Sequence, residues 1–160
     1  MPILALAADR AAAAFGLGPR KCLPLTVGTW NTLGGFDEDK GLVEYCQEQC
    51  GCDILGIQET RRDLTQRRSN RLIASCAPPA NDSGSGVALI LSARASAQLE
   101  CRGESEGSRL VWARFKGAPH DLLVICCYVP HHARANPSRG ETTAELYALA
   151  KALLKKGDCL

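Results

Sequence analysis

The segment from Asp53 to Thr60 constrains this chain most, because a short apolar run, Asp-Ile-Leu-Gly-Ile-Gln-Glu-Thr, ends in a carboxylate. A strand predicted over about 53–59 alternates with a period of two, which places on one face Asp53, Leu55, Ile57 and Glu59. Burying a carboxylate is costly unless a cation or hydrogen-bond donors meet it. Glu59 is therefore either a hydrated strand end or a ligand for a hard cation.

Two further predicted strands also end in polar side chains. A strand at about 24–31 ends at Asn31, which shares a face with Leu25, Val27 and Thr29, and a strand at about 122–129 carries Tyr128 near its end. Ligand sites in α/β proteins gather where strand ends meet loops. The sequence therefore predicts a functional site near these polar strand ends.

Five short motifs follow one another at spacings that resemble a known family: Trp30-Asn31, Gln58-Glu59-Thr60, Ser85-Gly86-Val87-Ala88, Arg109-Leu110-Val111 and Tyr128-Val129-Pro130. In this order they resemble the amino-terminal half of the endonuclease/exonuclease/phosphatase superfamily. That superfamily includes abasic-site DNA endonucleases, endonuclease domains of non-LTR retrotransposons, and inositol-phosphate and sphingolipid phosphodiesterases. The resemblance implies an α/β fold, a layered sandwich of mixed, largely antiparallel sheets flanked by helices and incomplete in this chain.

The resemblance also implies a reaction, the hydrolysis of a phosphodiester assisted by Mg²⁺ or Mn²⁺. Glu59 matches the metal-ligand Glu, Asn31 the Asn beside the metal and the scissile phosphate, and Tyr128 the Tyr that faces the phosphate. The alternatives are that Asn31 caps a turn and that Tyr128 is an ordinary strand terminus. Leu33 departs from the pattern, since the similar abasic-site endonucleases tend to carry an acidic residue there.

A basic cluster follows Glu59 and consists of Arg61, Arg62, Arg67, Arg68 and Arg71. The arginine fork matches phosphate oxygens, so Arg61, Arg62, Arg109 and His131 are predicted to contact the substrate. His131 stands where an Asn is common in the similar enzymes. The cluster, with the retrotransposon-like run Gly28-Thr29-Trp30-Asn31, favours nucleic acid, DNA in particular. The alternatives are a solvated basic segment and an inositol-phosphate or lipid phosphodiesterase.

The chain divides into an Ala-rich leader, predicted to be disordered, at 1–21 and the amino-terminal part of the domain at 22–160. Helices are predicted over about 39–49 and near the carboxyl end, where Thr142 and Glu145 form a capping box. The second helix carries an apolar stripe, Leu146, Leu149, Ala150 and Leu153. Further strands are predicted at about 72–77, 87–91, around Cys101 and at 109–115, the last forming an antiparallel hairpin with 122–129.

Nine cysteines at irregular spacing favour reduced thiols and an intracellular location, nuclear or cytoplasmic, over a disulfide scaffold. Cys46 and Cys50 have the spacing of a buried helical stripe, and with Cys52 they do not match paired zinc ligands. No stretch approaches the roughly 20 apolar residues that span a bilayer, so no membrane association is expected.

The family's later motifs, a Gly-Asp-x-Asn run, another acidic residue and an Asp-His pair, do not occur among these 160 residues. The histidines present are His120, His131 and His132. The resemblance therefore implies that this chain lacks the half that supplies the general base. The alternative to catalysis is a fragment that acts by association through an exposed sheet face or edge.

Overall fold

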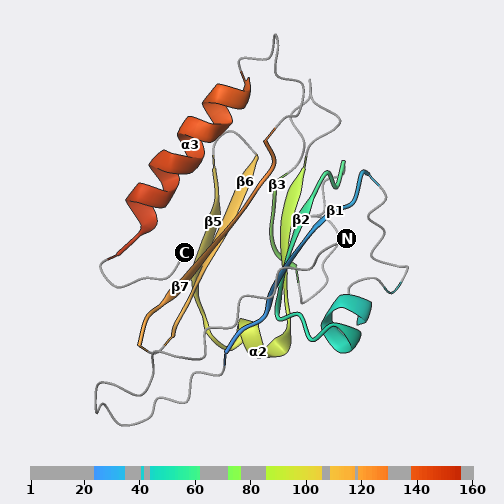
Figure 1. The fold of residues 1–160 in the computed structure, drawn as a ribbon. Coiled ribbons are helices and arrows are strands. Elements are labelled where there is room, and N and C mark those ends of the chain that lie inside the picture. The colour runs from blue at the N-terminus through green and yellow to red at the C-terminus, as the bar shows by residue number, and fades with distance from the viewer. Residues whose placement is uncertain are drawn as a thin grey trace.

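The computed structural model describes residues 24–34, 41, 44–61, 86–105, 109–117, 119–129 and 138–155, and the backbone of 72–76. Two β-sheets pack face to face, and a long helix lies against the outer face of one of them (Figure 1). The predicted layered α/β sandwich with mixed, largely antiparallel sheets is confirmed. The predicted leader at 1–21 lies outside the described residues.

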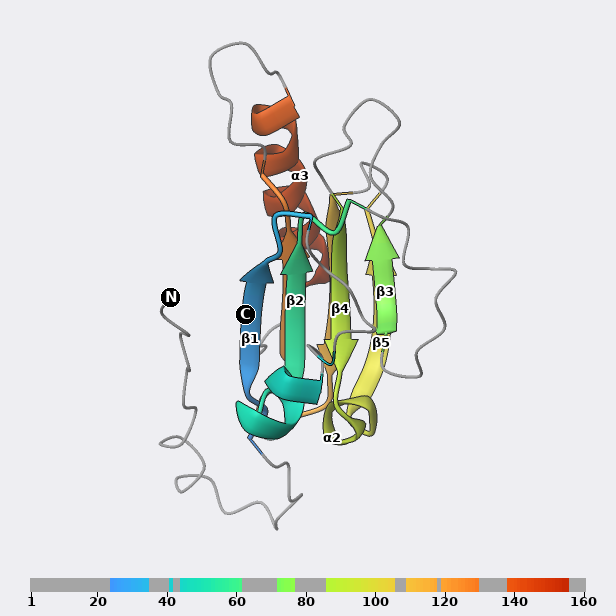
Figure 2. The same ribbon diagram turned by 90° about the vertical axis from the view of Figure 1, so that its right-hand side faces the viewer.

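The first sheet has the strand order β1-β2-β4-β3 (Figure 2). Its strands are β1 (Val27–Asn31), β2 (Ile54–Gln58), β3 (Leu72–Cys76) and β4 (Val87–Leu91). β1 and β2 are parallel, with Asn31 in register with Gln58, whereas β4 is antiparallel to both of its neighbours. The parallel pairing brings the carboxyl ends of β1 and β2 to the same edge of the sheet.

The second sheet is an antiparallel meander of β5 (Leu99–Glu104), β6 (Leu110–Phe115) and β7 (Leu122–Cys127). The predicted hairpin between the last two strands is confirmed by their antiparallel register. A single turn of helix, α2 (Ala93–Ser96), connects the two sheets, and the Ser92 hydroxyl caps it by accepting the N–H of Ala95. The sequence had not predicted α2.

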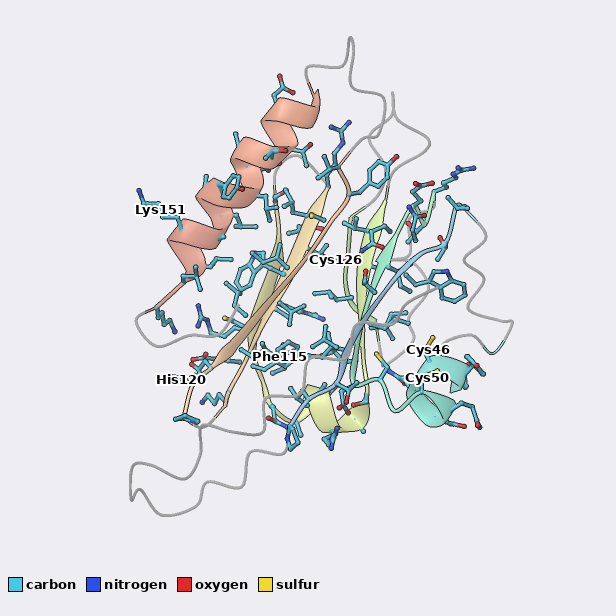
Figure 3. The ribbon with its side chains drawn as sticks, viewed as in Figure 1. Cys46, Cys50, Phe115, His120, Cys126 and Lys151 are labelled. Atoms are coloured by element: carbon cyan, nitrogen blue, oxygen red, sulfur yellow. The ribbon has the colours of Figure 1, made fainter. Side chains whose placement is uncertain are left out.

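Alternate residues of both sheets fill the space between them. The buried set comprises Ile54, Val87, Leu89 and Leu91 from the first sheet and Val111, Ala113, Phe115 and Cys126 from the second. Phe115 and Cys126 lie within this layer (Figure 3). Cys126 packs there as a small buried hydrophobe.

A smaller cluster lies on the outer face of the first sheet, where Trp30 and Cys46 pack against Cys52, Leu55, Ile57, Ala88 and Ile90. Cys46 belongs to η2 (Tyr45–Gln49), a π-helical turn that ends where the predicted 39–49 helix was expected to end. The start of that predicted helix lies outside the described residues. Cys50 is exposed, so the predicted buried stripe through Cys46 and Cys50 is wrong at its second position.

The carboxyl-terminal helix, α3 (Ser138–Leu153), runs along the outer face of the second sheet (Figure 1). Its predicted stripe is confirmed, because the four apolar residues are half-buried while Tyr147 between them is exposed. The predicted capping box is wrong, because the helix begins at Ser138 and Thr142 lies inside it. In the described part of the chain, no helix has both the length and the apolar character needed to cross a bilayer.

Candidate active site at the carboxyl ends of β1, β2 and β7

Asn31 and Glu59 meet where the parallel strands β1 and β2 end. The Asn31 side chain donates from Nδ2 to Glu59 Oε1 at 2.8 Å. Its carbonyl oxygen, Oδ1, accepts the backbone N–H of Leu33 at 3.0 Å. The amide is therefore held at both ends, and it fixes one oxygen of the carboxylate. The structure brings together the two residues that the sequence singled out as metal ligands.

The position of Glu59 corrects the predicted alternation. β2 ends at Gln58, and Glu59 has a φ of +55°, so it does not continue the strand face of Leu55 and Ile57. Asn31 is in register with Gln58 on the inter-sheet side, and strict alternation would aim Glu59 to the opposite side. The left-handed backbone instead turns the carboxylate toward Asn31.

Left-handed backbone costs a residue with a side chain roughly 1–2 kcal/mol, so the conformation of Glu59 needs support from its surroundings. Thr32 supplies part of it, because its hydroxyl lies 3.1 Å from the carbonyl oxygen of Gln58 and 3.0 Å from that of Glu59. The N–H of Gly34 also donates to the Glu59 carbonyl, at 2.9 Å. Thr60 is fully buried and donates its N–H to Gly86 O at 3.2 Å. No sequence pattern had indicated this role of Thr32.

Gln58 links the site to the second sheet. Its Nε2 donates to Thr29 Oγ1 at 2.7 Å and lies 3.4 Å from the Cys126 sulfur of β7. Cys126 therefore stands at the level of Gln58, between the sheets in Figure 3. Tyr128, two residues farther along, lies at the same end of the sandwich as Glu59 and packs against the inter-sheet core. Sequence reasoning had not assigned Gln58 a role, although the residue belongs to the Gln-Glu-Thr motif and could have been found from it.

Arg61 is the basic residue that the structure places at the site. Its Nη2 donates to Glu59 Oε2 at 3.4 Å, and its side chain is 49% exposed against 14% for Glu59. Arg61 also has a positive φ, +52°. Its side chain rests on Gly34, where the β-carbon of any other residue would lie 2.5 Å from Arg61 Cδ and 2.8 Å from its Nε. A glycine at position 34 therefore makes room for the guanidinium beside the carboxylate.

Arg109 and Tyr128 are neighbours across the start of β6 and the end of β7. The Tyr128 N–H donates to Arg109 O at 3.0 Å, and Arg109 Nη1 donates to Thr142 Oγ1 of α3 at 3.3 Å. The Arg109 side chain thus joins the strand end to the helix. The predicted substrate contacts Arg62 and His131 lie outside the described residues. His120 lies in the β6–β7 hairpin, at the opposite end of the sheets (Figure 3).

Asp53 lies at the far end of β2 from Glu59 and belongs to a different cluster. Its Oδ1 accepts from Ser92 Oγ and Arg94 Nε, both at 2.9 Å, and its Oδ2 accepts the Thr26 N–H at 2.9 Å. The second oxygen also receives Arg94 Nη2. Burial alone would raise the pKa of Asp53, but these donors outweigh it and hold the pKa below its usual range. Asp53 is therefore structural, although the sequence placed it on one face with Glu59.

The carboxylate and amide oxygens of Glu59 and Asn31 are compatible with a hard cation, but two residues supply few ligands. Across the ranges that the structure describes, there is no group of three or more His, Cys, Asp or Glu side chains able to hold a metal ion. Burial raises the pKa of the Cys52 thiol to about 11, which disfavours the thiolate that zinc requires. Within the described ranges, Glu59 and Asn31 remain the candidate ligands.

Solved structures share this fold. The catalytic domain of Xenopus laevis APE2 matches with a TM-score of 0.60 and 19% identity, over 82% of this chain and 55% of that one. A humanized D. rerio TDP2 matches with a TM-score of 0.55 and 15% identity, over 81% and 57%. An endonuclease/exonuclease/phosphatase family protein from Leptotrichia buccalis matches with a TM-score of 0.51 and 13% identity, over 78% and 61%. No protein-family model and no curated protein sequence matches.

These similarities establish the fold that the sequence motifs predicted, that of the endonuclease/exonuclease/phosphatase superfamily, over part of its length. The chain spans between 55% and 61% of the length of these three solved chains. Identities below 20% carry the fold and not the activity.

Proposed function

We propose, from the fold shared with APE2 and TDP2, that the parent domain to which this chain contributes hydrolyses phosphodiester bonds in nucleic acid with a bound Mg²⁺ or Mn²⁺. One observation carries the proposal. The two polar residues that the motifs single out, Asn31 and Glu59, are joined by a 2.8 Å hydrogen bond at the strand ends of a nuclease-like sandwich. A related D. rerio TDP2 structure contains a single-stranded DNA product, which supports nucleic acid as the substrate class.

The residues present fit a magnesium ion in its usual minimal form. Mg²⁺ keeps several waters and is often held by one or two carboxylates plus a substrate phosphate. Glu59 would be its carboxylate ligand, and Asn31 holds that carboxylate in place through Oε1. A bound metal would supply charge neutralisation at the phosphoryl group.

The chain's own groups would position the substrate. Arg61 lies beside Glu59 with a half-exposed side chain, and its guanidinium fork suits two phosphate oxygens. Tyr128 follows β7 beside Arg109, and its phenolic hydroxyl is the group proposed to face the phosphate. Arg109, which Thr142 anchors, is a further proposed substrate contact, as are Arg62 and His131, which lie outside the described residues. The general base is not among the groups that we assign.

The salt dependence of DNA binding tests the substrate class. With Arg61, Arg62 and Arg109 each neutralising one phosphate, the logarithm of the association constant is expected to fall with the logarithm of salt concentration with a slope of about −2 to −3. Fluorescence anisotropy of a labelled duplex and of its single strand, between about 50 and 200 mM salt, measures this slope. A DNA association constant that does not change with salt concentration contradicts the proposal.

Parallel assays on the same protein separate the two enzymatic alternatives. Mg²⁺-dependent nicking of DNA, stopped by a chelator, supports the nuclease. Release of phosphate from inositol phosphates while DNA stays intact would favour the inositol-phosphate or lipid phosphodiesterase.

A second candidate function is association, and the sheet edges favour it. β1 is a terminal strand of the first sheet and β7 of the second. β2 contacts β7 while β3 contacts β5, so the edges of β1 and β7 lie on the same side of the sandwich. Along this side the inward residues Leu25, Val27, Leu122 and Val124 are only half-buried. Among the described strands, neither edge pairs with a further strand, and such edges beside apolar side chains favour strand pairing with another polypeptide.

Association is expected to be visible in solution. Light scattering during size-exclusion chromatography is expected to show self-association or a bound companion, because the open side exposes both backbone and apolar groups. Val124→Lys, which places a charge on that side, is expected to reduce it. A monodisperse monomer with one cooperative melting transition contradicts the association function.

A further inference from the structure

The two oxygens of the Glu59 carboxylate are held unequally. Oε1 receives the Asn31 amide at 2.8 Å, a distance typical of a strong hydrogen bond to a charged acceptor. Oε2 receives Arg61 Nη2 at 3.4 Å, and the arginine is half exposed. Half-exposed ion pairs of this kind contribute little stability, so the contact with Arg61 is the one that a competing cation displaces.

We infer that Arg61 is the counter-ion of Glu59 in the absence of metal. When a divalent cation binds, the Arg61 guanidinium leaves Glu59 Oε2 and then holds a phosphate of the substrate. The inference rests on the proposed function, since it assumes that Glu59 is the metal ligand. Arg61 acts in it as a positioning residue, which couples the metal site to the phosphate site.

The local backbone keeps Arg61 close to both places. Positive φ angles at Glu59 and Arg61 flank the buried Thr60, and this turn brings the two side chains together. The arginine stem lies on Gly34, within 3.0 Å of where a methyl group at that position would be. The Arg61 side chain is thus held against Gly34 at Cδ, Nε and Cζ, while the side chain as a whole remains half exposed.

The charges at the site couple the binding of the metal to the binding of the phosphate. A divalent ion on Glu59 repels the guanidinium, whereas a phosphate attracts it and offers oxygens that match its fork. A phosphate that holds Arg61 away from Glu59 therefore improves metal binding. By linkage, the metal improves phosphate binding through Arg61 by the same factor.

Binding of Mn²⁺ alone, followed by the electron paramagnetic resonance of the free ion, tests the first half. Arg61→Ala is expected to bind Mn²⁺ about two- to five-fold more tightly than the unmodified chain, the range that an exposed ion pair allows. Arg102→Ala is the matched control, because it removes the same charge from an exposed position on β5. It is expected to leave the affinity unchanged.

The dinucleotide dTpdT at saturating concentration tests the second half. The dinucleotide is expected to tighten Mn²⁺ binding more in the unmodified chain than in Arg61→Ala. Because the direct contact between metal and phosphate is common to both proteins, the difference between them reports the contribution of Arg61. Equal affinities in Arg61→Ala and Arg102→Ala, or equal enhancement by dTpdT, overturn the counter-ion role. Unchanged Mn²⁺ binding in Glu59→Gln overturns the proposed metal site itself, so the two failures are distinguishable.

Discussion

In the parent domain, Glu59→Gln is expected to reduce Mg²⁺-dependent DNA cleavage by at least about 100-fold, since even the loss of a residue that only orients a metal ligand costs roughly 10–100-fold. The substitution removes the ligand charge but keeps the length of the side chain and an oxygen that accepts from Asn31. The left-handed turn at Glu59 depends on backbone contacts with Thr32 and Gly34, which the substitution does not touch. Nicking of a supercoiled plasmid across a Mg²⁺ titration measures the effect.

Glu100→Gln provides the control for this experiment. It removes one negative charge from an exposed position on β5, where the nearest cation, Lys155, lies 4.0 Å away. Its cleavage rate is expected to equal that of the unmodified chain. Equal activity of Glu59→Gln would show that the metal is held elsewhere. Absence of metal-dependent cleavage in the unmodified chain, despite Mn²⁺ binding, would favour the association function.

Asp53→Asn is expected to lower the free energy of unfolding by about 2–4 kcal/mol. The Asp53 side chain is only 7% exposed, and both of its oxygens accept hydrogen bonds. An amide keeps one acceptor but points its NH₂ group at a donor, either the Thr26 N–H or the Ser92 and Arg94 side chains. Two hydrogen-bond donors that face each other cannot bond, so both lose a hydrogen bond in a buried place. Arg94 also loses the negative charge that pairs with it. Urea unfolding at neutral pH measures the difference.

Asp121→Asn is the matched control, because its carboxylate accepts a single backbone N–H, that of Gly117 at 3.1 Å, in a half-buried loop. We expect it to cost no more than about 1 kcal/mol. A loss in Asp53→Asn no larger than in Asp121→Asn would contradict the structural role of the Asp53 cluster.

The same cluster predicts how stability depends on pH. The folded pKa of Asp53 lies below its unfolded value, which is about 3.9 for an aspartate. Its contribution is therefore fully present above the unfolded pKa and is lost as the pH falls through the lower, folded pKa. Unfolding between about pH 5 and pH 3 is expected to show a steeper loss of stability in the unmodified chain than in Asp53→Asn.

The strands were predictable because their signals are local. Alternating or continuous apolar runs identified β2, β4, β6 and β7, and the short connection at 116–121 identified the β6–β7 hairpin. The polar strand ends and the ordered motifs singled out Asn31 and Glu59, which the structure brings into hydrogen-bond contact. Helix ends were less predictable, because two start signals compete: Ser138 with Glu141 and Thr142 with Glu145 both have the capping-box spacing, and α3 begins at the first of them.

The sequence by itself determined which residues form the strands, which polar groups follow them and which superfamily they resemble. Only the tertiary structure decided where those groups point. Alternation assigned Asp53 and Glu59 to one face, yet Asp53 pairs with Arg94, which is 41 residues away, and Glu59 turns to Asn31. Periodicity describes a regular backbone, whereas hydrogen bonds from Thr32 and Gly34, brought in by the neighbouring strand, hold Glu59 in a left-handed conformation that no local pattern encodes.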